Sequence, residues 1–229
     1  GDLARWSAWV ERVGADHVRS AIAGERAAVD WVRDHADLVL AIAAKSPSPA
    51  LARLALVAID RRGGPYRLAE QIAAAAAEAP GISAVDRADL RVRHGMAVGY
   101  RSEAQAVGIL ARAAAEAPGE SPIRARASTE LALALARAGR DAEAEAHVAE
   151  AVLLAERLGD PEILAHACLG AFVVGRDVGW LERVMASGLP PSAPIRRVAA
   201  ATLAGALHDR GRLADIDPEA HVALTREAL

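Results

Sequence analysis

The sequence contains few aromatic residues: they make up 3% of its 229 residues, whereas hydrophobic residues as a whole make up 53%. Much of that hydrophobic share is alanine, the best helix former and a side chain too small to fill a wide core. Sheets favour β-branched and aromatic side chains on their faces, and the chain has only two tyrosines and one phenylalanine. The composition therefore predicts closely packed helices and no strand.

Cysteine and lysine are almost absent as well. The single cysteine, Cys168, excludes an internal disulfide framework and fits a reducing cytoplasm, which is the location we expect. The single lysine, Lys45, among many arginines indicates a GC-rich genome such as an actinobacterial one.

The chain also lacks long apolar runs and a charge of one sign. No apolar run reaches the roughly 18 residues of a membrane span, and no basic-then-apolar signal segment opens the sequence. The formal net charge is -3, and acidic and basic residues alternate along the same segments. We therefore expect no membrane contact and no direct nucleic-acid contact by this chain.

What the sequence does contain is helical periodicity, clearest in residues 141–158. Ala144, Val148 and Ala151 fall on one stripe of that segment, whereas Glu143 and Glu145 fall on the opposite side. The same test along the chain predicts helices at 3–13, 15–22, 25–44, 49–62, 65–78, 84–99, 103–117, 122–138, 141–158, 161–174, 177–187, 194–210 and 218–228. The connectors are short and rich in glycine and proline, which favours antiparallel neighbours.

Short sequences recur at a nearly constant spacing. The heptapeptide Ala-Ala-Ala-Glu-Ala-Pro-Gly occupies 75–81 and again 113–119, an offset of 38, and both copies end a predicted helix. Pro-Ile-Arg occupies 122–124 and 194–196, an offset of 72 or two repeats, and both copies begin one. Such self-similarity is the sequence signature of a helical repeat protein.

A Gly-Arg pair marks the turn inside three of the predicted helix pairs. It occurs at 139–140, 175–176 and 211–212, with an offset of 36 each time. Glycine adopts the left-handed backbone conformation that commonly ends a helix. We expect the glycine of each pair to serve as that helix stop.

Small residues form a further column, midway along four successive first helices. They are Gly95, Ala132, Gly170 and Gly205, at spacings of 37, 38 and 35 residues. A glycine inside a helix costs about 1 kcal/mol relative to alanine. The column therefore predicts that the backbone of a neighbouring helix comes close at these positions.

In this frame the repeat resembles the tetratricopeptide repeat (TPR). A large, a small and a large apolar residue on the first helix are followed by small, large and small residues on the second. These residues are Leu131, Ala132, Leu135, Ala144, Val148 and Ala151. The period exceeds the usual value of about 34, and most of the family's aromatic residues are missing, so the repeats are degenerate.

The fold class that follows is all-α. The resemblance implies a right-handed superhelix (α-solenoid) of degenerate TPR-like antiparallel helix pairs. We expect residues 1–46 to form an N-terminal helical junction region and residues 47–229 to form TPR-like repeats. The repeats would number about five helix pairs, the last incomplete or capping.

A segment upstream of the repeats carries a second resemblance. In residues 28–42, Trp31 is followed by Val32, an acidic residue at Asp34, a polar-Leu pair at 37–38 and an apolar helix. This order resembles the stretch that leads into TPR-like C-terminal repeats in bacterial STAND-type transcriptional regulators, the SARP and large ATP-binding LuxR classes. The sequence departs from that family in carrying aspartate where glutamate and asparagine are usual.

The second resemblance implies an interaction and effector-sensing arm of a multidomain transcriptional regulator. Its nucleotide-binding and DNA-binding modules would lie elsewhere, because this chain contains no Gly-rich phosphate loop of the GxxxxGK[ST] type. The alternative is a stand-alone TPR-like adaptor that binds a partner peptide. Both hypotheses describe a signalling or scaffolding protein without catalysis.

TPR arrays bind their ligands in a groove lined by the first helices. Carried onto this sequence, that geometry predicts a ligand or partner groove lined by Met96, Tyr100, Arg126, Thr129, Leu133 and Arg137. Arg126 and Arg137 would clamp a carboxylate, and Met96, Tyr100 and Leu133 would supply apolar contact. The occupant would be a protein or peptide, or a small-molecule effector. The alternative is that all six are ordinary solvated surface.

Neither a metal site nor a catalytic site is recognisable. The seven histidines show no metal-ligand spacing, and His166 and Cys168 are two residues apart on one helix and so diverge. Asp86 and Asp89 are one helical turn apart, but they are readily explained as acids in the first turns of a helix. We therefore expect no catalytic residues, no metal, no cofactor and no enzymatic activity, with Cys168 in the core.

Three of the four tryptophans lie near the N-terminus. We expect Trp6, Trp9 and Trp31 to fill the junction between the first helices, since large aromatic side chains usually serve burial; stacking on a ligand is the alternative. The fourth, Trp180, occupies a small-residue position of the repeat and indicates a distorted repeat.

Overall fold

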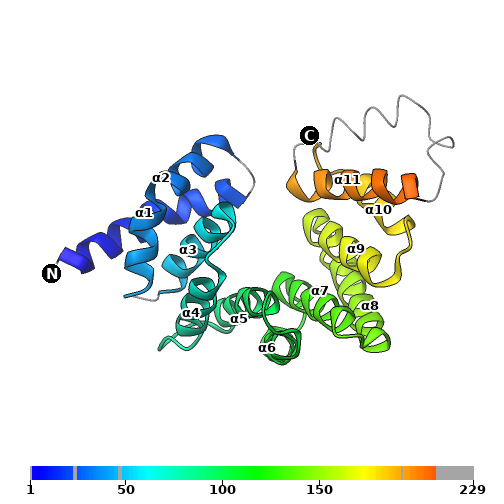
Figure 1. The fold of residues 1–229 in the computed structure, drawn as a ribbon, viewed down its shortest axis with the longest axis horizontal. Helices are drawn as coiled ribbons and strands as arrows, with labels where there is room; N and C mark the ends of the chain where they lie inside the picture. Colours follow the sequence, from blue (N-terminus) through cyan, green and yellow to red (C-terminus); the bar gives the residue numbers. More distant parts are fainter. Residues whose placement is uncertain (1, 23–24, 46–47, 192, 210–229) are drawn as a thin grey trace. The chain divides into compact units, whose positions relative to one another are not determined.

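The computed structural model describes residues 2–22, 25–45, 48–191 and 193–209, and the regular structure in these ranges is α-helical (Figure 1). Contacts between residues divide the chain into two compact units, residues 1–119 and residues 120–229. The predicted boundary between residues 46 and 47 falls outside the described residues and stays a prediction.

The first unit contains six helices in its described part. They are α1 (Asp2–Ile22), α2 (Arg26–Ala43), α3 (Pro49–Arg62), α4 (Tyr66–Ala77), α5 (Ala84–Gly99) and α6 (Glu103–Glu116). Each helix packs on the next, and α1 also packs on α3, as α3 does on α5. Contacts between alternate helices are what stacks one helix pair upon another.

The second unit repeats this arrangement. Its described helices are α7 (Pro122–Arg137), α8 (Asp141–Leu158), α9 (Pro161–Gly175), α10 (Gly179–Met185) and α11 (Pro194–Asp209). Here α7 packs on both α8 and α9, and α9 packs on both α10 and α11. The predicted helix at 218–228 lies outside the described residues.

Local sequence explains where most helices begin. The hydroxyl oxygens of Ser48, Ser83, Ser102 and Ser121 each accept the backbone N–H three residues later, which satisfies one orphan donor of α3, α5, α6 and α7. Proline occupies the first turn of α3, α7 and α9, where its missing N–H costs nothing. The predicted bounds of α2 to α11 agree with the structure within two residues at each end, both for these helices and for those without a side-chain cap.

The first helix corrects a prediction. Residues 3–13 and 15–22 form one continuous helix, α1, rather than two, and Gly14 lies inside it. Gly14 is not a helix stop: a Cβ atom there would overlap the side chain of Leu54 on α3. The glycine therefore allows α3 to approach α1, a reason that depends on a residue 40 positions away.

The Gly-Arg turns confirm one expectation and contradict another. Gly139 has φ of 72° after α7, as expected for a left-handed helix stop. At 175–176 the left-handed residue is Arg176, with φ of 57°, because α9 continues through Gly175. A left-handed non-glycine residue costs about 1–2 kcal/mol. The pair at 211–212 lies outside the described residues.

Two glycines of the small-residue column lie at crowded points, and the atoms that crowd them belong to side chains rather than to backbone. A Cβ on Gly95 would lie 2.5 Å from Cγ of Leu110 on α6, and a Cβ on Gly170 would lie 2.6 Å from Cγ2 of Thr129 on α7. Ala132 is fully buried. Gly205 differs, since no described atom lies within 4 Å of its Cβ position.

Among the helices that the structure describes, none combines the length and the apolar character needed to cross a membrane.

Candidate functional site

Two of the six predicted groove residues lie in the first unit. Met96 and Tyr100 are both exposed, at the C-terminal end of α5, and Tyr100 is 72% exposed. The ring of Tyr100 stacks on that of Tyr66 at the start of α4, with centroids 4.1 Å apart and planes 22° apart. The pair gives the α4–α5 edge of this unit a flat aromatic surface.

The other four lie on α7 in the second unit. Arg126 and Leu133 are half-buried, and Arg137 is exposed. Thr129 is fully buried, its hydroxyl donates to the Ala125 carbonyl oxygen at 2.9 Å, and its methyl group faces Gly170. Thr129 therefore packs α7 against α9 and offers no side chain to a ligand. The groove itself, with residues in both units, stays a prediction.

A pair formed by a buried acid and a half-buried imidazole lies between α7 and α9, and the sequence did not reveal it. Glu130 is 6% exposed, and its Oε1 lies 3.1 Å from Nε2 of His166. Burial raises the pKa of Glu130, but the hydrogen bond and charge of His166 and the charges of Arg126 and Arg137 outweigh burial, so its pKa lies below the usual value. The two predicted clamp arginines thus already act on an internal carboxylate.

The spacing of residues along α7 could have placed Glu130 on the packed face of that helix. It follows Ala127 by three residues and precedes Ala134 by four, and both alanines are fully buried. A charged residue on the packed face of a helix requires a buried partner. The identity of that partner, His166, required the tertiary structure, because 36 residues separate the two.

The second unit also carries an apolar groove of about 490 Å³ between α8, α9 and α10. Its walls include Val152 and Leu153 of α8, Val174 of α9 and Trp180 of α10. Leu153 is 56% exposed, on the side of α8 that faces away from the core.

One edge of this α8–α10 groove is charged. Arg183 forms an ion pair with Glu156, and its guanidinium carbon lies 5.7 Å from the centroid of the Trp180 ring. Trp180 thus lines a surface groove; its place in the repeat had suggested only a distortion. The sequence signal for the groove is Leu153, an apolar residue among the polar positions of α8.

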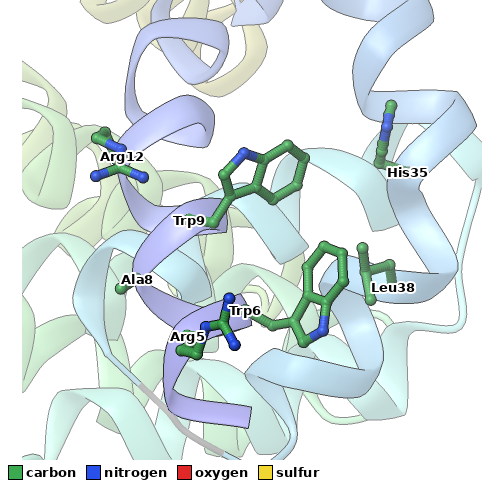
Figure 2. Close-up of a pocket in the computed structure, with 7 residues that line it drawn as sticks. All are labelled: Arg5, Trp6, Ala8, Trp9, Arg12, His35 and Leu38. Atoms are coloured by element: carbon green, nitrogen blue, oxygen red, sulfur yellow. The ribbon is translucent and has the colours of Figure 1, made fainter. Parts of the chain in front are cut away.

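The three N-terminal tryptophans do not all serve burial. Trp9 and Trp31 are half-buried and pack against the core of the first unit, as expected, whereas Trp6 is 51% exposed. Trp6 and Trp9 line a second cleft, of about 970 Å³, between α1 and α2 (Figure 2). Trp31 does not line this cleft but packs against Trp9.

Asp86 and Asp89, the acid pair considered for catalysis, both form ion pairs with one arginine. Arg53 on α3 donates from Nε to Asp89 at 2.8 Å and also pairs with Asp86. The hydrogen bond from Arg53, followed by that from Ser83, lowers the pKa of Asp86. Both acids therefore tie α5 to α3.

Cys168 is fully buried, and that burial raises the pKa of its thiol. In the described ranges, no group of three or more histidine, cysteine, aspartate or glutamate side chains is placed to hold a metal ion.

No protein-family model matches the sequence, and no curated protein matches it. Among solved structures, the chain is similar to BtubC (BKLC) from P. vanneervenii, with a TM-score of 0.58 at 16% identity, over 99% of this chain and 90% of that one. It is also similar to a Podosopora anserina putative kinesin light chain with nearly identical TPR-like repeats, with a TM-score of 0.46 at 22% identity, over 83% of this chain and 92% of that one.

At such low identity, the likeness to BtubC shows the fold alone. This chain is an all-α solenoid of TPR-like helix pairs, as the sequence predicts. The tryptophan-bearing segment that resembles STAND regulators forms part of α2, ahead of the pair α3–α4.

Proposed function

We propose that this chain is a non-catalytic protein-interaction module. The observation that carries the proposal is the α8–α10 groove, where Leu153 and Trp180 offer apolar surface to solvent between packed helices. An exposed apolar groove between helices is a surface that a partner's amphipathic helix or extended segment covers. Helices that pack mainly on their neighbours can present such a groove without using it for their own core.

We further propose that the module is the effector-sensing arm of a multidomain transcriptional regulator of the STAND class, acting in the cytoplasm. The support is the order of elements: the segment containing Trp31 forms α2, and helix pairs follow from α3 onward. Binding of a partner or effector to the stack would favour one of its conformations and so alter how it contacts an ATPase module. DNA contact would belong to another part of such a regulator.

The competing proposal is a stand-alone TPR-like adaptor that holds a partner's peptide segment. The α8–α10 groove serves this function equally well, because peptide capture needs no nucleotide switch. The two proposals differ in what the chain is attached to and in whether partner binding depends on nucleotide.

The deciding experiment is immunoblotting of the endogenous protein in source-cell lysate, combined with photo-crosslinking to an ATP analogue. A band several-fold heavier than 23.8 kDa that labels with the analogue supports the regulator. A band near 23.8 kDa without label contradicts the regulator and favours the adaptor.

A further inference from the structure

The cleft between α1 and α2 has an aromatic floor held in place by several ring contacts. The Trp31 ring stacks on His35 with centroids 4.5 Å apart, and Trp9 lies 6.3 Å from Trp31 and 6.4 Å from His35. Nδ1 of His35 lies 2.9 Å from the Trp31 carbonyl oxygen, which it can reach as a donor. Trp9 and His35 line the cleft, and Trp31 packs against both, so contacts within the chain hold the rings of this floor together.

The rim of the cleft is less buried. Trp6 packs edge-on against Trp9, with centroids 5.8 Å apart and planes 87° apart, yet half of its surface is exposed. Leu38 of α2, also exposed, lines the cleft with Trp6 (Figure 2). Exposed Trp6 and Leu38 beside this aromatic floor form an apolar patch that a partner could desolvate.

Two arginines give the α1 side of the cleft a positive charge. Arg5 and Arg12 both line it and are exposed, with the small side chain of Ala8 between them (Figure 2). They are seven residues apart, two helical turns, which corresponds to about 10 Å along α1. Ala8 leaves room between them for a helix to approach closely.

We propose that the α1–α2 cleft binds an acidic amphipathic helix of a partner protein. A bulky apolar side chain of that helix would lie between Trp6 and Leu38, and carboxylates two turns apart would pair with Arg5 and Arg12. This inference rests on the proposed interaction role but not on the choice between regulator and adaptor.

Other occupants fit the charges less well. A two-fold dimer formed through this face would bring Arg5 and Arg12 of both copies to the same contact. A cationic ligand would meet the same two arginines. A nucleic-acid backbone carries phosphates along its whole length and would also come close to the exposed carboxylates Asp34 and Asp37 of α2, whereas an amphipathic helix can confine its carboxylates to the α1 side of the cleft.

The test uses two synthetic peptides of about 18 residues, long enough to populate a helix. Both carry the same leucine and phenylalanine stripe; one places glutamates two turns apart beside it, and the other places lysines there. Binding to the full chain is measured by fluorescence anisotropy of a fluorescein label and by tryptophan emission. We expect the glutamate peptide to bind and the lysine peptide to bind at least about tenfold more weakly, which corresponds to 1.4 kcal/mol.

Charge reversal provides the sharper comparison. In Arg5→Glu/Arg12→Glu the preference should invert, so that the lysine peptide now binds more tightly. Trp6→Ala should weaken binding of both peptides about tenfold or more, as expected for an aromatic anchor. Arg67→Glu/Arg112→Glu, which reverses two exposed arginines on α4 and α6, is the matched control and should change nothing. Circular dichroism and thermal melting confirm that each variant is folded.

Three outcomes would overturn the proposal. One is equal binding of the two peptides. Another is a self-association that Trp6→Ala abolishes in sedimentation, which would make a second copy the occupant. The third is loss of binding with Leu153→Ala but not with Trp6→Ala; the peptide would then occupy the α8–α10 groove, and the proposed interaction function would survive without this cleft.

Discussion

Buried Glu130 of α7 and half-buried His166 of α9 form a pair, with 3.1 Å between Oε1 and Nε2, at the contact between two successive first helices. A carboxylate held in this way accepts a strong hydrogen bond and carries its charge only while it is ionised.

Acid should remove this contribution. The pKa of Glu130 is lowered in the folded chain, so its stabilising effect is fully present above the unfolded-state value of about 4.3 and is lost as the pH falls through the folded value. We expect Glu130→Gln to lower the melting temperature at neutral pH, with the difference narrowing below about pH 4. Melting curves across this range provide the measurement. Glu145→Gln, at an exposed position of α8, should show no such trend.

A methyl group at Gly170 should destabilise the α7–α9 contact. The added Cβ would lie 2.6 Å from Cγ2 of Thr129, and overpacking of a core costs about 1–3 kcal/mol. Thr129→Ser removes that Cγ2 atom, so the double variant should recover part of the loss. Urea unfolding of the two single variants and the double variant measures the coupling. Gly205→Ala, where no described atom is near, should be neutral or stabilising; equal losses at both glycines would contradict this account.

The tie between α3 and α5 should depend on Arg53. Its guanidinium is half-buried and pairs with both Asp86 and Asp89, so Arg53→Met removes the ion-pair partner that joins these two carboxylates to α3, although Asp89 keeps Arg93 and Asp86 keeps the Ser83 hydroxyl within α5 and its cap. We expect a loss of about 1–3 kcal/mol in the free energy of unfolding. Arg67→Met on α4, an exposed arginine, is the comparison and should change the unfolding midpoint little. An equal loss of stability in Arg53→Met and Arg67→Met would mean that the ion pairs of Arg53 contribute nothing specific.

Partner capture should depend on the α8–α10 groove. Leu153 is exposed, so Leu153→Glu should leave the melting temperature nearly unchanged while placing a charge on the apolar wall. The measurement is quantitative mass spectrometry of the proteins that co-purify with the tagged chain from source cells. We expect the Leu153→Glu variant to recover less of these proteins than the unsubstituted chain does. Val85→Glu, an exposed position on α5, should retain them. Equal retention by both variants would argue against the groove.

Helix positions were predictable because their signals are local. A serine three residues before the donor it caps, and a proline in the first turn, begin most helices whatever surrounds them. The predicted break between residues 13 and 15 was wrong. Gly14 is required by its contact with Leu54, which is distant in sequence, and not by a local helix stop. The Gly-Arg pair at 175–176 also differs from its prediction, because α9 runs one residue further and Arg176 takes the left-handed conformation.

The candidate sites were less predictable. Sequence spacing located Met96 and Tyr100 at a surface, but it placed Thr129 on a groove although that residue is buried between α7 and α9. A shift of one residue turns a side chain by about 100° around a helix, so a small error in register exchanges the packed face for the exposed one.

By itself the sequence determined an all-α chain of TPR-like helix pairs, since composition, periodicity, capping residues and repeated spacing act within one helix or between neighbours. Only the tertiary structure decided that Glu130 meets His166, that Trp6 remains exposed beside Leu38, and that Leu153 and Trp180 border one groove. Those relationships join residues 27 to 36 positions apart. They depend on how each helix is rotated about its axis, which packing sets and no local signal encodes.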